Sequence, residues 1–224
     1  SIMGQRMLVW DVPTRVFHWL LVVSFAGAFL TAESERYRDI HVVLGYTLLG
    51  LIVFRLVWGF VGTRYALFRS FCFKPCEIKD YVASLLKSKP KHYVGHNPAG
   101  SVAVFALLAL GIASGVTGVL VFEEVGGDML EEAHDLVSYA MLGVVGLHVV
   151  GVLISSVMHR ENLVRSMITG FKSVQPNQAI NRAHVWLGVI MFVAVIAFWI
   201  GYSATGLVGS NSGVKNTQQH SNDD

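Results

Sequence analysis

Residues 134–158 read HDLVSYAMLGVVGLHVVGVLISSVM, and this run decides the fold of the 224-residue chain. A helix needs about 20 consecutive, mainly apolar residues to cross a bilayer, and after Asp135 the run carries no acidic, lysine or arginine residue. It therefore predicts a membrane-spanning helix. His134 and His148 stand fourteen residues apart in it, which is nearly four helical turns and about 21 Å of rise. We expect the two imidazoles on one face of the helix, at opposite depths of the bilayer.

Four further apolar runs of this kind occur, at residues 16–32, 40–62, 99–122 and 183–208. The composition agrees, because 53% of the residues are hydrophobic and only 14% are charged, whereas a soluble domain carries about a quarter charged residues. The sequence thus predicts an all-α integral membrane helix bundle. We expect a four-helix core within residues 8–172, an additional transmembrane helix at 183–208, and a disordered tail at 209–224, which is polar and rich in Gly, Ser and Asn.

The charges of the loops predict how the bundle is oriented in the membrane. The loop after the second span is basic, with Arg64, Arg69, Lys74, Lys79, Lys87, Lys89 and Lys91. The loop after the fourth span is also basic, with Arg160, Arg165, Lys172 and Arg182. The loop between the third and fourth spans is acidic, with Glu123, Glu124, Asp128, Glu131 and Glu132. The positive-inside rule then predicts a multi-pass membrane protein with a cytoplasmic amino terminus and an external carboxyl terminus. These basic residues are orientation signals, so they do not indicate a nucleic-acid site.

The basic loop after the second span has structure of its own. Apolar residues recur at helical spacing between charged neighbours over residues 76–88, which predicts a short helix lying on the cytoplasmic membrane face. Cys72 and Cys76 lie near its start and are interpreted as structural or incidental. The chain contains no Cys-x-x-Cys-His run, which excludes covalent c-type haem attachment. We expect no cleavable signal peptide, because the first apolar run lacks a small-residue cleavage pattern.

Four of the nine histidines lie in the spans or at their ends, and the topology sorts them by depth. His18 enters from the cytoplasm with the first span, and His148 reaches the inner half of the fourth. His41 and His134 both lie near the outer surface, because the second and fourth spans enter from outside. The pairs His18–His148 and His41–His134 therefore predict two b-type haems, each with two imidazole ligands. Such six-coordinate iron suits electron transfer rather than oxygen binding.

Two arginines are expected to pair with haem propionates. Arg55 is an ionisable residue inside a span, where a charge costs roughly 2.5–3.5 kcal/mol and usually has a partner. It follows His41 by fourteen residues and so faces the same way, one haem level lower. Arg15 precedes His18 by three residues, on the same face and one turn nearer the cytoplasm. Both are assigned to the inner haem.

Other interpretations of the histidines stay open. A histidine at the end of a span is often an ordinary interfacial residue. A metal-transport site normally adds buried acidic ligands, and no span has an Asp or Glu at its centre. A solvated role is expected for His92 and His159, whereas His96 and His184 are candidates for binding a propionate or for protonating a quinone.

Several motifs carry a resemblance to a known family. They are WDVPTRVFHW at residues 10–19, HVVLGY at 41–46 with RLVWGFVG at 55–62, and GHNP at 95–98. In these motifs the chain resembles the bacterial cytochrome b561 family, and GHNP is similar to its branch of nickel–iron hydrogenase b-type cytochrome subunits. The histidine spacing of the fourth span resembles that of formate dehydrogenase cytochrome subunits. The resemblance covers about residues 8–172 and implies His18, His41, His134 and His148 as haem ligands. The family core has four helices, so the fifth span leaves the branch and the partner open.

The patterns together predict a transmembrane electron-transfer subunit that links an external redox partner to the quinone pool. The partner is a hydrogenase, another dehydrogenase or a periplasmic cytochrome, and the sequence does not choose among them. The alternative is a self-sufficient quinone-linked enzyme, such as a superoxide oxidase or a ferric reductase, with a substrate site lined by Arg36 or Arg38. A haem-free transport protein is a third possibility and predicts a colourless preparation.

Overall fold

Five long helices dominate the structure, a computed structural model that describes residues 4–215, with side chains as far as residue 205. They are α1 (Val12–Thr31), α2 (Arg38–Val61), α4 (Pro98–Phe122), α5 (Gly127–Met158) and α7 (Val185–Lys215). All five are long and apolar enough to cross a membrane. The predicted all-α membrane bundle is therefore confirmed. Helix α7 includes residues 209–215 of the expected disordered tail, and residues 216–224 of that tail lie outside the described part of the chain.

The remaining elements are short and lie in the connections. These are β1 (Gln5–Leu8), the 3-10 helix η1 (Phe68–Ser70), α3 (Pro75–Leu86), α6 (Leu163–Thr169), β2 (Phe171–Val174) and the 3-10 helix η2 (Pro176–Gln178). Helix α3 occupies the region in which a short amphipathic helix was expected. Strands β1 and β2 form a small antiparallel sheet that pairs Gln5 with Val174 and Leu8 with Phe171. This sheet is not expected from the sequence, because four-residue strands leave little periodic signal.

The starts of the long helices follow from local chemistry. Asp11 caps α1 by accepting a hydrogen bond from the backbone N–H of Thr14 at 2.7 Å, and Asn97 caps α4 through the N–H of Gly100 at 2.7 Å. Helix α5 begins at Gly127, seven residues before the apolar run that predicted it. The added turns contain acidic residues, which are stabilised at the positive amino end of a helix.

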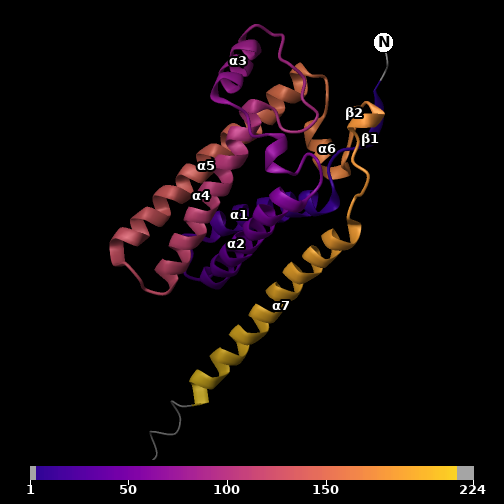
Figure 1. Ribbon diagram of the computed structural model, residues 1–224. Helices are drawn as coiled ribbons and strands as arrows, with labels where there is room; N and C mark the ends of the chain where they lie inside the picture. Colours follow the sequence, from indigo (N-terminus) through magenta and orange to yellow (C-terminus); the bar gives the residue numbers. More distant parts are fainter. Residues whose placement is uncertain (1–3, 216–224) are drawn as a thin grey trace, which may run out of the picture.

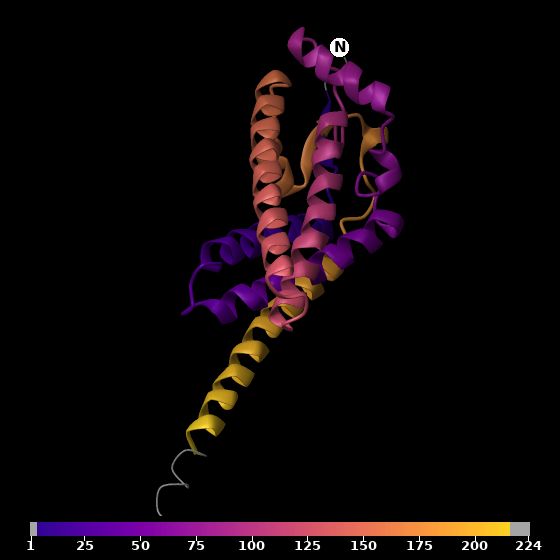
Figure 2. The same ribbon diagram turned by 90° about the vertical axis from the view of Figure 1, so that its left-hand side faces the viewer.

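The long helices form two antiparallel hairpins, α1 with α2 and α4 with α5 (Figure 1). Helix α4 packs against α2, and α7 packs along α1 before its C-terminal part extends beyond the other helices (Figure 2). We call the end with the connections 32–37 and 123–126 the acidic end, after its Glu33, Glu35, Glu123 and Glu124. The opposite end, with the connections 62–97 and 159–184, is called the basic end.

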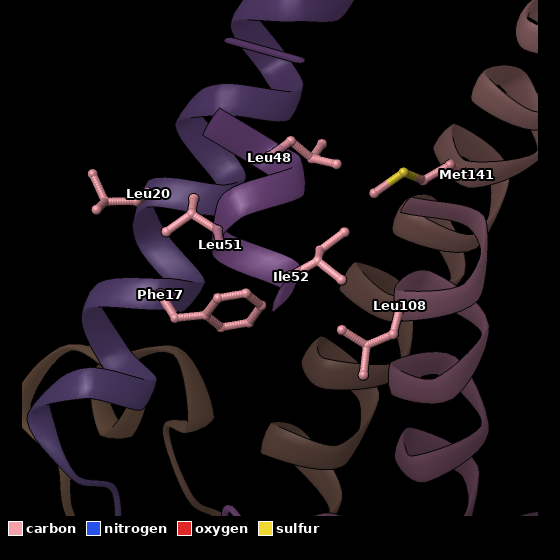
Figure 3. Packing of buried hydrophobic residues seen from close by; sticks show 7 residues of the cluster. All are labelled: Phe17, Leu20, Leu48, Leu51, Ile52, Leu108 and Met141. Atoms are coloured by element: carbon pink, nitrogen blue, oxygen red, sulfur yellow. The ribbon is translucent and has the colours of Figure 1, made fainter. Parts of the chain in front are cut away.

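A compact apolar cluster joins the two hairpins (Figure 3). It comes from α1, α2, α4 and α5 and consists of Phe17, Leu20, Leu48, Leu51, Ile52, Leu108 and Met141. Glycine at position 111 of α4 permits the close approach, because a Cβ atom there would lie 2.4 Å from Cδ1 of Ile52. Met141 stands seven residues from both His134 and His148, so the cluster lies at the level midway between these histidines along α5.

Candidate functional site

The acidic end brings together the first predicted histidine pair. The ring centroids of His41 on α2 and His134 on α5 lie 6.3 Å apart, with their planes at 82°. Nδ1 of His41 lies 2.6 Å from the carbonyl oxygen of Ala28 on α1. A carbonyl only accepts hydrogen bonds, so this contact places the proton on Nδ1 and leaves the lone pair on Nε2.

Thr117 on α4 places the proton of His134 on Nδ1 in the same way. Its Oγ1 donates to the carbonyl of Ala113 at 2.7 Å and lies 3.0 Å from Nδ1 of His134. Because the hydroxyl proton is engaged by Ala113, the oxygen accepts from Nδ1–H and Nε2 keeps its lone pair. A partner on the second nitrogen is typical of metal-ligating histidines, since it fixes the tautomer and the ring orientation.

A largely apolar cavity surrounds this pair between α1, α2, α4 and α5. Its lining includes Phe25, Phe29, Gly45, Leu48, Gly115, Gly118 and Tyr139 as well as the two histidines. Gly45 stands one turn after His41, and a Cβ atom there would meet nothing within 4 Å. At Gly118 a Cβ atom would lie 3.0 Å from Cε1 of His134. The small residues thus leave space beside the imidazoles.

The second pair lies toward the basic end. The ring centroids of His18 on α1 and His148 on α5 are 6.5 Å apart, with their planes at 60°. Nδ1 of His18 is buried and has no hydrogen-bond partner among the described residues. A buried polar nitrogen without a partner is costly in a protein interior, so this atom is a candidate for a group that the chain itself does not supply.

The spacing of both pairs fits two imidazoles on opposite sides of one metal ion. A metal–imidazole bond is about 2 Å long, and a ring centroid lies about 1 Å behind its nitrogen, so trans ligands have centroids about 6 Å apart. Residues 4–205 contain no cluster of three or more His, Cys, Asp or Glu that would hold a metal ion. A metal ion held by either pair would take its further donors from a bound group, as the iron of a haem takes four nitrogens from its ring.

The backbone leaves room for such a ligand. Among the described elements, α5 packs closely on α4 along its length, whereas its approach to α1 and α2 is mainly through side chains. Both histidine pairs bridge this wider gap. The residues present thus fit two flat groups between α5 and the α1–α2 hairpin.

The two predicted propionate partners have different surroundings. Arg55 is only 3% exposed; its Nη2 donates to the carbonyl of Ala66 at 2.9 Å, and its Nη1 is buried without a partner in the described structure. Arg15 donates from Nε to the carbonyls of Trp10 and Asp11 and from Nη1 to that of Ile168. Arg55 keeps a free buried donor, whereas the donors of Arg15 connect α1 to α6.

His96 lies where the loop from the basic end enters the bundle. Its ring packs against Trp10 and Phe71, with centroid separations of 5.0 and 4.7 Å. Burial is the largest cause and the positive charge of Arg55 the second, and with smaller effects of His148, Lys172 and His18 they lower the pKa of His96 to about 3. The ring is therefore neutral at physiological pH and stands in the electrostatic neighbourhood of the His18–His148 pair.

The other basic-end histidines belong to a charged cluster. His92 lies 3.2 Å from a carboxylate oxygen of Glu161, and Nζ of Lys172 lies 3.6 Å from the same oxygen. Lys172 is buried, which lowers its pKa. Burial alone would raise the pKa of Glu161, but the hydrogen bond from His92 and the charge of Lys172 outweigh it and lower that pKa. The ring of His159 packs 5.2 Å from that of His92.

Some predicted residues lie apart from the pairs, and some functional contacts were missed. His184 packs on Trp58 at the start of α7, Arg36 and Arg38 are exposed at the acidic end, and Cys72 and Cys76 are exposed at the basic end. Sequence reasoning missed Thr117, Asp11 and Lys172. Asp11 precedes Val12–Pro13 and could have been recognised as a helix cap, but no sequence signal marks Thr117 or Lys172.

Comparisons with known proteins give an independent view of the chain. The sequence profile of the family described as prokaryotic cytochrome b561 matches residues 9–170. A probable Ni/Fe-hydrogenase B-type cytochrome subunit of Rhodobacter capsulatus is 24% identical, over 76% of this chain and 82% of that protein. Its counterpart from Azotobacter vinelandii is 25% identical, over 73% and 87%. The probable Ni/Fe-hydrogenase 1 B-type cytochrome subunit of Escherichia coli K12 is 23% identical, over 74% and 90%. No solved structure matches the chain significantly.

Proposed function

The chain belongs to the prokaryotic cytochrome b561 family, and from this premise we propose that it holds two b haems and transfers electrons across the bacterial inner membrane. Family membership and the five apolar helices make it a multi-pass membrane protein that carries haem b and serves electron transport. The number of haems, their ligands, the orientation and the partners are the proposal.

The observation that carries the proposal is the meeting of four histidines as two pairs. Their ring centroids lie 6.3 and 6.5 Å apart, at two levels of one bundle. Incidental interfacial histidines have no reason to face each other twice across the same inter-helix gap. We assign His41 and His134 to one haem and His18 and His148 to the other.

The chain's own groups orient and bury these ligands. Ala28 and Thr117 hold the protons of His41 and His134 on Nδ1, so that both Nε2 atoms present lone pairs. The apolar cluster with Ile52, Leu108 and Met141 excludes water from the level between the pairs. Arg55 offers its free Nη1 donor to a propionate of the basic-end haem. Bound haem supplies reversible one-electron chemistry, with a potential set by ligands, hydrogen bonds and burial.

The orientation and the partners follow from charge and from the relatives. The positive-inside rule supports a cytoplasmic basic end, which makes His41–His134 the outer pair. The relatives are described as probable Ni/Fe-hydrogenase B-type cytochrome subunits, so a hydrogenase is the first partner to test, and another dehydrogenase or a periplasmic cytochrome is possible under the same proposal. On the inner side, the neutral ring of His96 supports the proposal that a quinone binds there, because its N–H can donate a hydrogen bond to a quinone oxygen.

Haem stoichiometry tests the ligand assignment directly. A pyridine haemochrome assay on the purified protein is expected to give about two haems per chain, falling to about one in His148→Ala and in His134→Ala. His92→Ala and His159→Ala are matched controls, because these histidines lie in the charged cluster of the basic end, and both should keep about two. One haem in the wild type would make one pair wrong, and none would reject the cytochrome assignment.

Isolation of the chain from its membrane tests the partner. Co-purification of a hydrogenase, dehydrogenase or cytochrome that reduces the haems supports the role of a subunit. Quinone-dependent turnover by the isolated chain, lost in Arg36→Gln/Arg38→Gln, would instead indicate a self-sufficient enzyme with its substrate site at the acidic end.

A further inference from the structure

A groove of about 550 Å³ lies between the end of α2 and the start of α7. This volume is within the range of about 300–1,000 Å³ that is typical of ligand pockets. The walls come from the turn after α2 and from the connection between β2 and α7, and the lining is Gly62, Thr63, Arg64, Pro176, Asn177, Ala179, Ile180, Asn181, Arg182 and His184. The groove is distinct from the histidine pairs, which share none of these residues.

The groove has the charge of an anion site. Arg64, Arg182 and His184 line it, and no Asp or Glu is among its described lining residues. Within residues 4–205 neither arginine forms a salt bridge. Arg64 donates one hydrogen bond, from Nη1 to the carbonyl of Asn177 at 2.9 Å. A guanidinium has five N–H donors, so Arg64 has donors left for a ligand. The planar fork of arginine suits phosphate oxygens, which it binds in pairs.

The amino end of α7 adds to this field. The helix begins at Val185, directly after His184. The first N–H groups of a helix have no partner inside it, and the helix dipole places partial positive charge there. Anions are stabilised at such an end. The start of α7 and the two arginines therefore both favour a negatively charged ligand.

Hydrogen bonds hold the walls of the groove in place. The hydroxyl of Tyr65 donates to the carbonyl of Gln178 at 2.6 Å, and the N–H groups of Ile180 and Val12 donate to the carbonyls of Leu8 and Ala183 at 2.9 and 2.8 Å. A groove that is formed before its ligand arrives loses less entropy on binding.

The position of the groove favours a lipid headgroup over a free phosphate ion as the ligand. It lies where two membrane spans end, so its opening is at the membrane–water interface. Exposed Trp186, Val189, Ile190 and Val193 follow from there along one face of α7 at helical spacing. Trp is enriched at this interface, and the apolar face below it suits acyl chains. By the proposed orientation this is the cytoplasmic leaflet, which is rich in anionic lipid.

We propose that this groove binds the phosphate headgroup of an anionic phospholipid, through Arg64, Arg182 and the amino end of α7, with the acyl chains along the exposed face of α7. The site gives the fifth helix a role that the haem-binding core does not explain, because the lipid connects α7 to the end of α2. The inference does not depend on the haem assignments.

Native mass spectrometry of the whole protein, released from detergent after titration with phosphatidylglycerol or phosphatidylcholine, tests the site. We expect preferential retention of phosphatidylglycerol by the wild type. Arg64→Gln/Arg182→Gln should bind it at least about tenfold more weakly, as expected for the loss of charged hydrogen bonds. The control Arg69→Gln/Arg165→Gln removes the same charge from exposed basic-end arginines outside the groove and should stay within about twofold to threefold of the wild type.

Each other result overturns the proposal. Equal retention of the two lipids by the wild type would show that the groove does not recognise an anionic headgroup, and equal losses in both double variants would leave only general electrostatics. Displacement of phosphatidylglycerol by millimolar inorganic phosphate would assign the groove to a free anion instead. Arg182→Gln alone guards against misfolding, because Arg182 makes no side-chain hydrogen bond in the described structure, and it should already weaken retention severalfold.

Discussion

Nδ1 of His41 lies 2.6 Å from the carbonyl oxygen of Ala28, thirteen residues earlier on the neighbouring helix. Ala28 is among the last four residues of α1, whose carbonyls have no partner within the helix. The imidazole N–H therefore gives this carbonyl a short hydrogen bond, and the hydroxyl of Thr31 donates to the same oxygen at 3.2 Å. The same bond turns Nε2 of His41 away from α1, so the end of one helix sets the tautomer of a ligand on the next.

Removing the hydroxyl at Thr117 tests the corresponding partner of His134. Thr117→Val keeps the shape of the side chain but leaves Nδ1–H of His134 without its acceptor. Loss of such an outer partner typically costs about 10–100-fold in metal affinity. We expect less haem at the acidic-end site and an unchanged site at His18–His148, as measured by haem content and by separate ferric haem signals in electron paramagnetic resonance.

Thr31→Val is the matched control for this change. The hydroxyl of Thr31 bonds to the carbonyls of Gly27 and Ala28 near the same end of the bundle and does not contact a histidine ring. Ala28 also accepts from Nδ1 of His41, and the loss of the Thr31 hydroxyl leaves that shorter bond in place. It should therefore retain the acidic-end haem. Equal losses in both variants would mean that packing near that end, and not the tautomer of His134, determines occupancy.

Filling the space beside His41 tests whether the cavity is the haem site. Gly45 lines the cavity, and its built Cβ meets no atom within 4 Å. Gly45→Leu should therefore leave the helix bundle folded while its side chain occupies the volume of the ligand. We expect the haem content to fall from about two to about one per chain, with the acidic-end signal lost.

Gly50 provides the comparison on the same helix. It too has no neighbour within 4 Å of a built Cβ, but it is exposed on α2 and does not line the cavity. Gly50→Leu should keep both haems. A Gly45→Leu variant with two haems would show that the cavity is not where the outer group binds.

The sequence was sufficient for the spans and for the histidine partners because both depend on simple periodicity. Apolar runs long enough to cross a bilayer mark α1, α2, α4, α5 and α7. Loop charge gave each span a direction, which is enough to sort histidines by depth. The structure brings His18 near His148 and His41 near His134, as that sorting predicts.

The contacts of Lys172 and Thr117 were not predicted, because they join residues far apart in the sequence and no local sequence pattern indicates them. Lys172 is buried on β2 and donates to the carbonyl of Val94, which is 78 residues earlier. Thr117 reaches His134 only because the connection 123–126 folds α5 back along α4. The start of α5 was placed too late because its first turns are acidic, and hydropathy alone detects only the part of a helix that is apolar.

Asp11 is predicted to stabilise the join between α1 and α2. The residue is fully buried, and its carboxylate accepts from the N–H of Thr14, from Nε1 of Trp58 at 3.1 Å and from the hydroxyl of Thr63. Asp11→Asn replaces one acceptor oxygen by an amide donor that faces other donors. We expect a loss of about 1–3 kcal/mol in the free energy of unfolding, measured by denaturant unfolding of the detergent-solubilised protein.

The exposed Asp80 of α3 provides the control for this substitution. It makes no hydrogen bond or salt bridge among the described side chains, so Asp80→Asn should change stability by less than about 0.5 kcal/mol. If Asp11→Asn leaves the free energy of unfolding unchanged, the hydrogen bonds of Asp11 are not what joins α1 to α2.

His96 is predicted to make the protein less stable in acid. Its pKa in the folded protein is about 3, because burial and the charge of Arg55 disfavour the protonated ring, whereas the ordinary value is 6.5. Between these pH values the unfolded chain binds a proton that the folded chain does not, so the free energy of unfolding falls as the pH is lowered. From pH 6.5 to pH 5 the loss amounts to at most about 2 kcal/mol, at 1.36 kcal/mol for each pH unit.

The variant His96→Phe isolates this contribution from those of other groups. Phenylalanine cannot be protonated and can pack between Trp10 and Phe71 as the histidine ring does. Lys172, Glu161 and His159 remain in place, and His159, whose pKa burial also lowers, contributes a similar acid sensitivity to both proteins. Denaturant unfolding at pH 7.5 and pH 5 should therefore show a smaller acid-induced loss in the variant than in the wild type. Equal losses would mean that His96 is protonated in the folded protein, as it would be if it paired with a haem propionate.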